Sequence, residues 1–170
     1  MDPAQTTGAS PPPELLELAE LRSQLARYRA AFELSVPGQA LIGLTGRFLE
    51  ANASLCQILG YSQAELQSRR FLDITHPDDQ AEGQAEGQQA AIDMQSGKLA
   101  QYRCEKRYLR PDGRTVWALV TAHLARDAAG QPLYFAAVIE DITERKASPS
   151  RAHAAVFAGA GALAGLSRAP

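Results

Sequence analysis

The stretch 108–146 restricts the fold more than any other, because it specifies two strands, two turns and an exit from a sheet. A Pro-Asp-Gly sequence at 111–113 predicts the first turn, since proline presets φ, Asp bonds its own backbone and glycine accepts positive φ. Residues 115–125 are rich in β-branched, aromatic and apolar side chains, and a second cluster of turn residues follows them. Residues 133–139 form another apolar run, which ends at the charged segment 141–146. The stretch therefore predicts two antiparallel strands followed by a polar helix.

The residues that mark these turns and strands follow one another in a fixed order: Asp112, Gly113, Trp117, Asp127, Gly130, Pro132 and residues 141–146. In this order they resemble the C-terminal half of a PAS domain of the S-box type, with its PAC motif. The segment 46–66, which reads GRFLEANASLCQILGYSQAEL, and the His-Pro-Asp-Asp sequence at 76–79 resemble the same family. The resemblance extends from about residue 31 to residue 146.

The resemblance implies an α+β fold, in which a five-stranded antiparallel sheet has the order 2-1-5-4-3. Short helices and one longer helix would cover one face of this sheet. The domain is expected over 36–146, with the PAC segment at 101–146. A proline-rich leader at 1–13 is expected to be disordered, and the Ala/Gly-rich tail at 147–170 to be loose, although a helix that docks or inserts is the alternative.

An amphipathic helix is expected at residues 14–35, before the domain. Its apolar stripe recurs at three and four residues and consists of Leu18, Leu21, Leu25, Tyr28 and Phe32. One interpretation is a helix that packs this stripe on the other face of its own sheet. The other is a short coiled coil that pairs two copies of the chain, although two heptads are fewer than a coiled coil usually shows. Both interpretations stay open.

Helix signals also mark the middle of the chain. Asn52 predicts the N-cap of a short helix that ends at Gly60, and Ser62 begins a capping box with Glu65. The longer helix is expected over about 78–96.

Two glycines, Gly83 and Gly87, lie inside the longer helix. Each costs up to about 1 kcal/mol relative to alanine in a helix interior, so we expect this helix to be the least stable of the domain. In the strand at 101–109, alternation places Tyr102, Cys104 and Tyr108 on one buried side.

Small side chains on neighbouring strands, such as Ala122 and Ala136, leave room for a small molecule. The pocket residues we expect are Leu55, Leu59, Phe71, Ile92, Ala118, Val120 and Ala137. The alternative is that Phe71, Leu59 or Ile58 fills the space.

No cofactor or metal site is indicated by the sequence. The histidines are His76, His123 and His153. None of them lies near another histidine, a cysteine or a carboxylate at the spacing that metal ligands require. Haem-binding PAS domains carry their axial histidine in the long helix, which has none here. In the flavin-binding photosensory branch a cysteine precedes an Arg-Phe-Leu sequence, and Arg69 has that position here. We therefore expect neither haem bound in that way nor flavin-cysteinyl photochemistry.

The sequence indicates no catalytic activity, and the expectation of a sensor comes from the resemblance alone. No nucleophile–base pair or phosphate-binding loop is present, and the net charge of −2 gives no basic footprint for nucleic acid. The tail is shorter than a membrane span, and the N-terminus lacks the pattern of a secretory signal. We expect a cytoplasmic chain without membrane contact.

The resemblance implies a sensory module of bacterial signal transduction that binds a small molecule or a partner signalling protein. Its signal is expected to leave through Trp117, Asp141, Ile142, Thr143 and Arg145. The alternatives are a ligand-free dimerisation module, which would form a homodimer, and the sensor fragment of a histidine kinase or a diguanylate cyclase.

Overall fold

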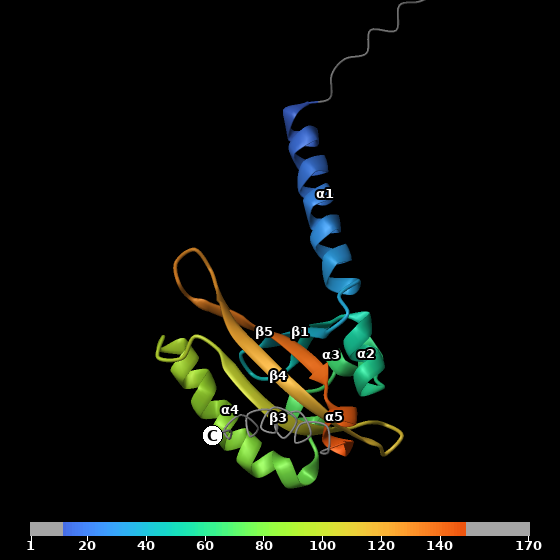
Figure 1. Cartoon of the computed structure of the whole chain (residues 1–170). Coiled ribbons are helices and arrows are strands. Elements are labelled where there is room, and N and C mark those ends of the chain that lie inside the picture. Colours follow the sequence, from blue (N-terminus) through green and yellow to red (C-terminus); the bar gives the residue numbers. More distant parts are fainter. Residues whose placement is uncertain (1–11, 149–170) are drawn as a thin grey trace, which may run out of the picture.

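The computed structural model describes residues 12–148 (Figure 1). Almost all of the leader and almost all of the tail lie outside the described residues, as does His153, and Ala147 at the start of the expected tail belongs to α5. The helices are α1 (Pro13–Glu33), α2 (Ala53–Leu59), α3 (Gln63–Gln67), the 3-10 helix η1 (Phe71–Ile74), α4 (Pro77–Gln95) and α5 (Thr143–Ala147). The strands are β1 (Gly38–Gly43), β2 (Phe48–Ala51), β3 (Tyr102–Leu109), β4 (Thr115–Arg126) and β5 (Pro132–Asp141).

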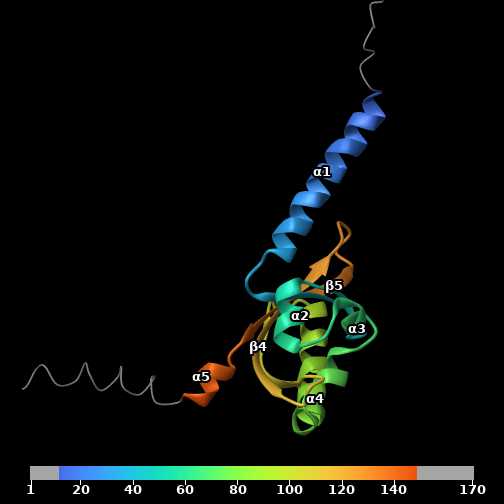
Figure 2. The same cartoon turned by 90° about the vertical axis from the view of Figure 1, so that its right-hand side faces the viewer.

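The five strands form one antiparallel sheet in the order β2-β1-β5-β4-β3. This confirms the α+β fold class and the expected strand order. The turns at Gly46, Gly113 and Gly130 have φ values of 83°, 81° and 80°, a region that glycine enters without steric cost. Helices α2, α3 and α4 lie on one side of the sheet, and α5 leaves on the other (Figure 2).

A row of alanines crosses the sheet on the side that the helices cover. Ala122 of β4 pairs with Ala137 of β5, which also pairs with Ala40 of β1. Ala40 in turn pairs with Ala51 of β2, and Tyr102 of β3 is opposite Ala122. Because these four side chains are small, they extend only a short distance above the backbone of the sheet along this row. Helices can approach it closely at one end and leave space at the other.

The helix signals of the sequence are confirmed. The Asn52 side chain accepts from the backbone N–H of Leu55 at 2.9 Å, and Gly60 ends α2 with a φ of 76°. Ser62 and Glu65 form the reciprocal hydrogen bonds of a capping box at α3. These caps set the direction of α2 and α3, whose buried leucines Leu55, Leu59 and Leu66 pack against the β1–β2 end of the sheet.

Helix α1 extends away from the sheet instead of covering it (Figures 1 and 2). The expectation that it packs on the sheet's other face is wrong, since α1 contains no buried residue. Leu18, Leu21 and Leu25 are exposed by 44, 56 and 66%, and Tyr28 by 76%. Phe32, in the last turn, is partly buried. An apolar stripe predicts contact with some partner surface, but the sequence of the helix does not identify that surface. Within the described residues, the stripe of α1 has no partner.

Candidate functional site

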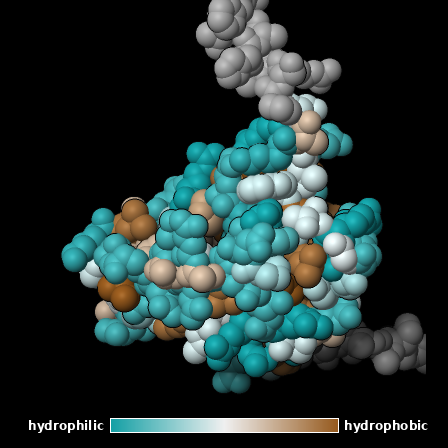
Figure 3. Space-filling model, turned by 90° about the horizontal axis from the view of Figure 1, so that it is seen from below, coloured by the Kyte–Doolittle hydropathy of each residue, from teal (hydrophilic) through white to brown (hydrophobic). Residues whose placement is uncertain are grey.

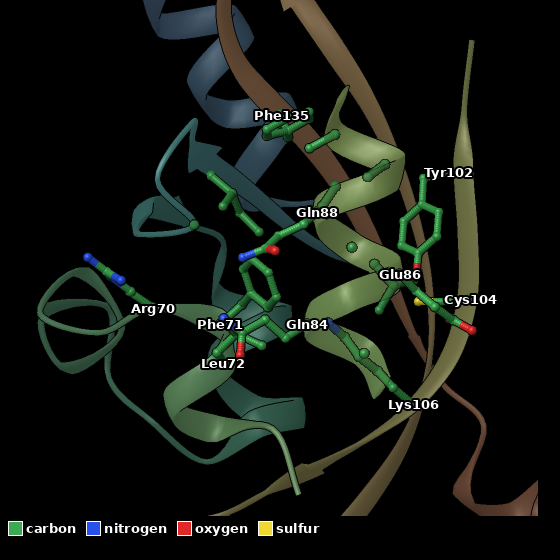
Figure 4. Close-up of a pocket in the computed structure, with 18 of the residues that line it drawn as sticks. Arg70, Phe71, Leu72, Gln84, Glu86, Gln88, Tyr102, Cys104, Lys106 and Phe135 are labelled. Carbon is green, nitrogen blue, oxygen red and sulfur yellow. The ribbon is translucent and has the colours of Figure 1, made fainter. Parts of the chain in front are cut away.

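A cavity of about 740 Å³ lies between α4 and the sheet, with η1 and the β1–β2 turn at its side (Figure 4). This volume is in the range of small-molecule sites. Ala122, Val120 and Ala137 of the sheet line it, together with Phe71 of η1. On the face seen from below, the surface is mostly hydrophilic, with small and separate hydrophobic areas (Figure 3). That face therefore presents no broad apolar surface.

Three of the residues expected at a pocket line this cavity: Phe71, Val120 and Ala137. Leu55, Leu59 and Ala118 are instead fully buried in the core, exposed by at most 1%. Leu55 and Leu59 are the buried residues of α2, and Ala118 belongs to β4. All three fill the core, which the sequence could not distinguish from a pocket wall.

Ile92 is 58% exposed and does not line the cavity. Helix α4 presents Ala91 and Met94 to the cavity in its place. Adjacent positions of a helix differ by about 100° around its axis. A prediction that is wrong by one residue therefore selects a side chain that faces solvent instead of the cavity.

The wall that α4 contributes is built from small residues four positions apart. Gly83, Gly87 and Ala91 all line the cavity. A Cβ atom built on either glycine would meet nothing within 4 Å, so open space lies beside both positions. The glycines that weaken the helix therefore also widen the cavity.

The opposite wall comes from β3. Tyr102, Cys104, Lys106 and Tyr108 lie on the cavity side of that strand, opposite Ala122, Val120, Ala118 and Val116 of β4. Figure 4 shows Tyr102, Cys104 and Lys106 on the β3 side and Phe71 on the η1 side. Burial raises the pKa of the Tyr102 and Tyr108 hydroxyls. Both phenols therefore remain neutral hydrogen-bonding groups at physiological pH.

Lys106 was missed by our sequence analysis, although its position carries the signal. It has the same parity as Tyr102 and Cys104, so a lysine falls on the face of β3 that should be buried. Its ammonium lies 4.5 Å from the centre of the Phe71 ring and 5.0 Å from that of Tyr108.

The start of α4 is fixed to β3 by Asp79. Its carboxylate accepts from the backbone N–H of Arg107 at 3.0 Å and also binds the guanidinium of that arginine. The hydrogen bonds from Arg107 lower the pKa of Asp79. Both side chains are about three-quarters buried, so this pair connects the cavity wall to the outer side of the sheet.

Trp117 continues this connection on the outer side of β4. The Arg107 guanidinium lies 5.5 Å from the centre of its ring, and the Lys146 ammonium of α5 lies 4.7 Å from it. Glu105 binds Lys146 at 2.5 Å and Arg145 at 2.7 Å. Helix α5 is thus held by charges on β3 and by the aromatic ring between them.

Residues 26–142 match the family model described as PAS fold. The chain belongs to the PAS family. The match covers more than half of the sequence, and the resemblance inferred from the turns and strands is confirmed.

Two relatives of this PAS domain are signalling proteins. It is 44% identical over 119 residues to "Probable diguanylate cyclase DgcE" of Escherichia coli (strain K12), covering 70% of this chain and 10% of that protein. It is 32% identical over 126 residues to "Sensor histidine kinase TmoS" of Ectopseudomonas mendocina, covering 74% and 12%. The chain spans about a tenth of the length of these relatives, and its matches include only their PAS part.

Solved PAS domains share the fold. A PAS domain from Colwellia psychrerythraea aligns with a TM-score of 0.62 at 18% identity, over 72% of this chain and 99% of that one. The PAS domain of a LuxR-family transcriptional regulator from Burkholderia thailandensis, solved in complex with ethanol, aligns with a TM-score of 0.55 at 22% identity, over 68% and 97%.

Asn52 joins helix α1 to the PAS domain. Its side chain is fully buried, and its amide nitrogen donates to the carbonyls of Phe32 and Pro37 at 3.0 and 3.2 Å. Its oxygen accepts from the N–H of Gln39 at 2.9 Å as well as from Leu55. One side chain therefore fixes the end of α1, the start of β1 and the start of α2.

Within residues 12–148 no group of three or more His, Cys, Asp or Glu side chains is placed to hold a metal ion. His76 caps α4, where its Nδ1 accepts from the N–H of Asp78 at 3.3 Å. None of the helices described in these residues is long and apolar enough to cross a membrane.

Proposed function

We propose that this PAS domain senses a small molecule in the cavity beneath α4 and transmits its presence to α5. The observation that carries the proposal is the direct succession of contacts from the cavity wall to the exit. Asp79 of α4 binds Arg107, which lies over Trp117, and Trp117 also lies under Lys146 of α5. A ligand that displaces α4 would therefore change the contacts that hold α5.

The proposed mechanism is a shift between two arrangements of α4. Only Ala90 and Met94 of its nineteen residues are buried, and two glycines lower its helical stability. Little apolar contact must be broken to move such a helix. A ligand that binds one arrangement better would change the populations by its differential affinity.

The output of this sensor is proposed to be an effector of the kind its relatives contain, a diguanylate cyclase or a histidine kinase. The effector would follow α5 in a longer protein or be a separate partner. The described residues would contribute sensing and no catalysis. The proposed compartment is the cytoplasm, where the free thiols of Cys56 and Cys104 would stay reduced.

Native mass spectrometry of protein purified without refolding tests the proposal. We expect a surplus mass equal to one small molecule per chain. The matched control is Gly87→Leu, which places a side chain in the open space beside α4 and should remove the surplus. Absence of a surplus, together with no shift of melting temperature across a library of small metabolites, would contradict the proposal.

A second candidate function is a dimerisation module. The exposed apolar residues of α1 favour it: Leu15, Leu16, Leu18, Leu21, Leu25 and Tyr28. Pairing two copies of α1 would remove these side chains from water. Sedimentation of the full chain at several concentrations tests it, with Leu18→Ser/Leu25→Ser as the variant. A concentration-dependent dimer that the variant abolishes would support it, and a monomer at all concentrations would exclude it.

A further inference from the structure

We infer that the ligand of the cavity is an organic anion with an apolar body, whose carboxylate pairs with Lys106. The inference deepens the proposed function and rests on it, because it assigns the chemical class of the molecule that the cavity beneath α4 accepts. Its basis is the ammonium of Lys106, unpaired within residues 12–148, and the apolar side chains of that cavity.

Lys106 is a cation without a carboxylate partner among the described residues. The ion pairs found there engage His76, Arg107, Arg110, Arg114, Arg145 and Lys146. Lys106 is half-buried and lines the cavity, and two aromatic rings lie beside its ammonium. Aromatic faces attract an ammonium more weakly than a carboxylate does, so a ligand anion would gain a charge-assisted bond.

The carboxylates that line the cavity do not supply this bond. Asp79 binds Arg107, and Glu105 binds Arg145 and Lys146. Glu82 and Glu86 also line the cavity, but both are exposed on α4, and water screens their charge. A cationic ligand would therefore find carboxylates that are either already paired or exposed to water, whereas an anionic one would find a partly desolvated ammonium without a carboxylate partner in the described chain.

The rest of the wall favours an apolar body behind that anion. Phe71, Leu72 and Phe135 enclose the cavity from η1 and β5 (Figure 4). Val120, Ala122 and Ala137 of the sheet also line it. Ala118 is directly opposite Lys106 in the β3–β4 pairing, and its methyl group leaves space for the lysine stem to lie along the sheet. A second charge on the ligand would face these apolar groups at a cost in desolvation.

Isothermal titration of the full chain with 4-phenylbutyrate and with 4-phenylbutan-1-ol tests the inference. The two probes share one apolar body and differ in charge. We expect the acid to bind about tenfold more tightly or better. This preference should disappear in Lys106→Met, persist in Lys106→Arg and persist in Lys98→Met, which removes an exposed lysine beyond α4.

Equal binding of the two probes, no binding of the acid, or an unchanged preference in folded Lys106→Met would overturn the inference. The Gly87→Leu variant separates this outcome from failure of the sensor proposal. If the alcohol binds the wild type at least as tightly as the acid does and Gly87→Leu excludes it, the proposal of a ligand cavity stands and only the preference for an anion is rejected. If neither probe binds and native mass spectrometry finds no surplus mass, both the anion and the sensor are rejected.

Discussion

The backbone N–H of Trp117 donates to Oγ1 of Thr143 at 3.0 Å. In return, the carbonyl of Trp117 accepts from the N–H of Ile142 at 2.8 Å. The backbone of Trp117, near the start of β4 (Thr115–Arg126), is therefore bonded directly to Ile142 and Thr143 at the exit from the sheet. Any movement of β4 at this point reaches the start of α5 through two hydrogen bonds.

Replacing Thr143 by valine should loosen this junction. The substitution keeps the shape of the side chain and removes the acceptor of the half-buried Trp117 N–H, at a cost of about 1 kcal/mol. Amide hydrogen exchange should become faster at Trp117 and through α5 (Thr143–Ala147). Thr121→Val, on the outer side of the same strand, is the matched control and should leave exchange in α5 unchanged.

Asp141→Ala should affect the exit without unfolding the domain. The Asp141 carboxylate accepts from the N–H of Thr143 at 2.9 Å, and the residue is exposed. Loss of this local bond should change the urea midpoint little, while the output of an attached or separate effector becomes independent of the ligand. Unfolding of the variant, or an unchanged output, would reject the coupling role of Asp141.

Acid should weaken the contact between α4 and β3. Because Arg107 depresses the folded-state pKa of Asp79, this contribution is fully present above the unfolded value of about 3.9. It is lost as pH falls through the lower folded pKa. Urea unfolding from pH 7 to pH 3 should show that Asp79→Asn has lost part of the acid-dependent decrease in stability.

Asp78→Asn is the control for that experiment. Asp78 occupies the same first turn of α4, so either substitution removes one favourable charge near the helix N-terminus. Its side chain is 72% exposed, compared with 23% for Asp79. Asp78 also lies 3.6 Å from the Arg107 guanidinium, but the hydrogen bonds of Arg107 go to Asp79. An equal loss of acid dependence in the two variants would mean that negative charge in this turn, rather than the hydrogen bonds between Asp79 and Arg107, is responsible.

Asn52→Ala should strongly destabilise the domain. It leaves the N–H groups of Gln39 and Leu55 and the carbonyls of Phe32 and Pro37 without their partner. We expect a loss of about 2–4 kcal/mol, since a buried unpaired group costs about 1–3 kcal/mol and only the bond to Leu55 is fully buried, while the other three are part-buried. Asn52→Asp keeps the acceptor and loses the donor, and urea unfolding should place it between the alanine variant and the wild type.

Only part of the role of Asn52 could be predicted from the sequence. Its role as an N-cap could be predicted, because a cap depends on residues within one helical turn. Its bonds to the end of α1 join residues 20 positions apart, and no local pattern encodes that distance. The strand order was likewise available only through the family resemblance, since alternation specifies faces and not neighbours.

The cavity was predicted in part for the same reason. Ala137 and Val120 could be assigned to the inner face from strand parity, and both line the cavity. Parity also assigned Ala118 to that face, but whether a face residue meets space or a neighbouring side chain depends on the path of α4. Lys106 was the informative exception, because a charged residue of inner parity needs a partner wherever the helix lies.

Gly83→Ala and Gly87→Ala should each stabilise the domain by up to about 1 kcal/mol. Neither added methyl group would meet an atom within 4 Å, so the helical gain is not offset by a clash. Gly113→Ala is the matched control, since its surroundings are equally open but its φ of 81° is strained for alanine. Urea unfolding should place the control on the opposite side of the wild type. If the helix glycines favour the shift of α4, a ligand should change amide exchange in α5 less in the two stabilised variants than in the wild type. An undiminished change would mean that the stability of α4 does not affect signalling.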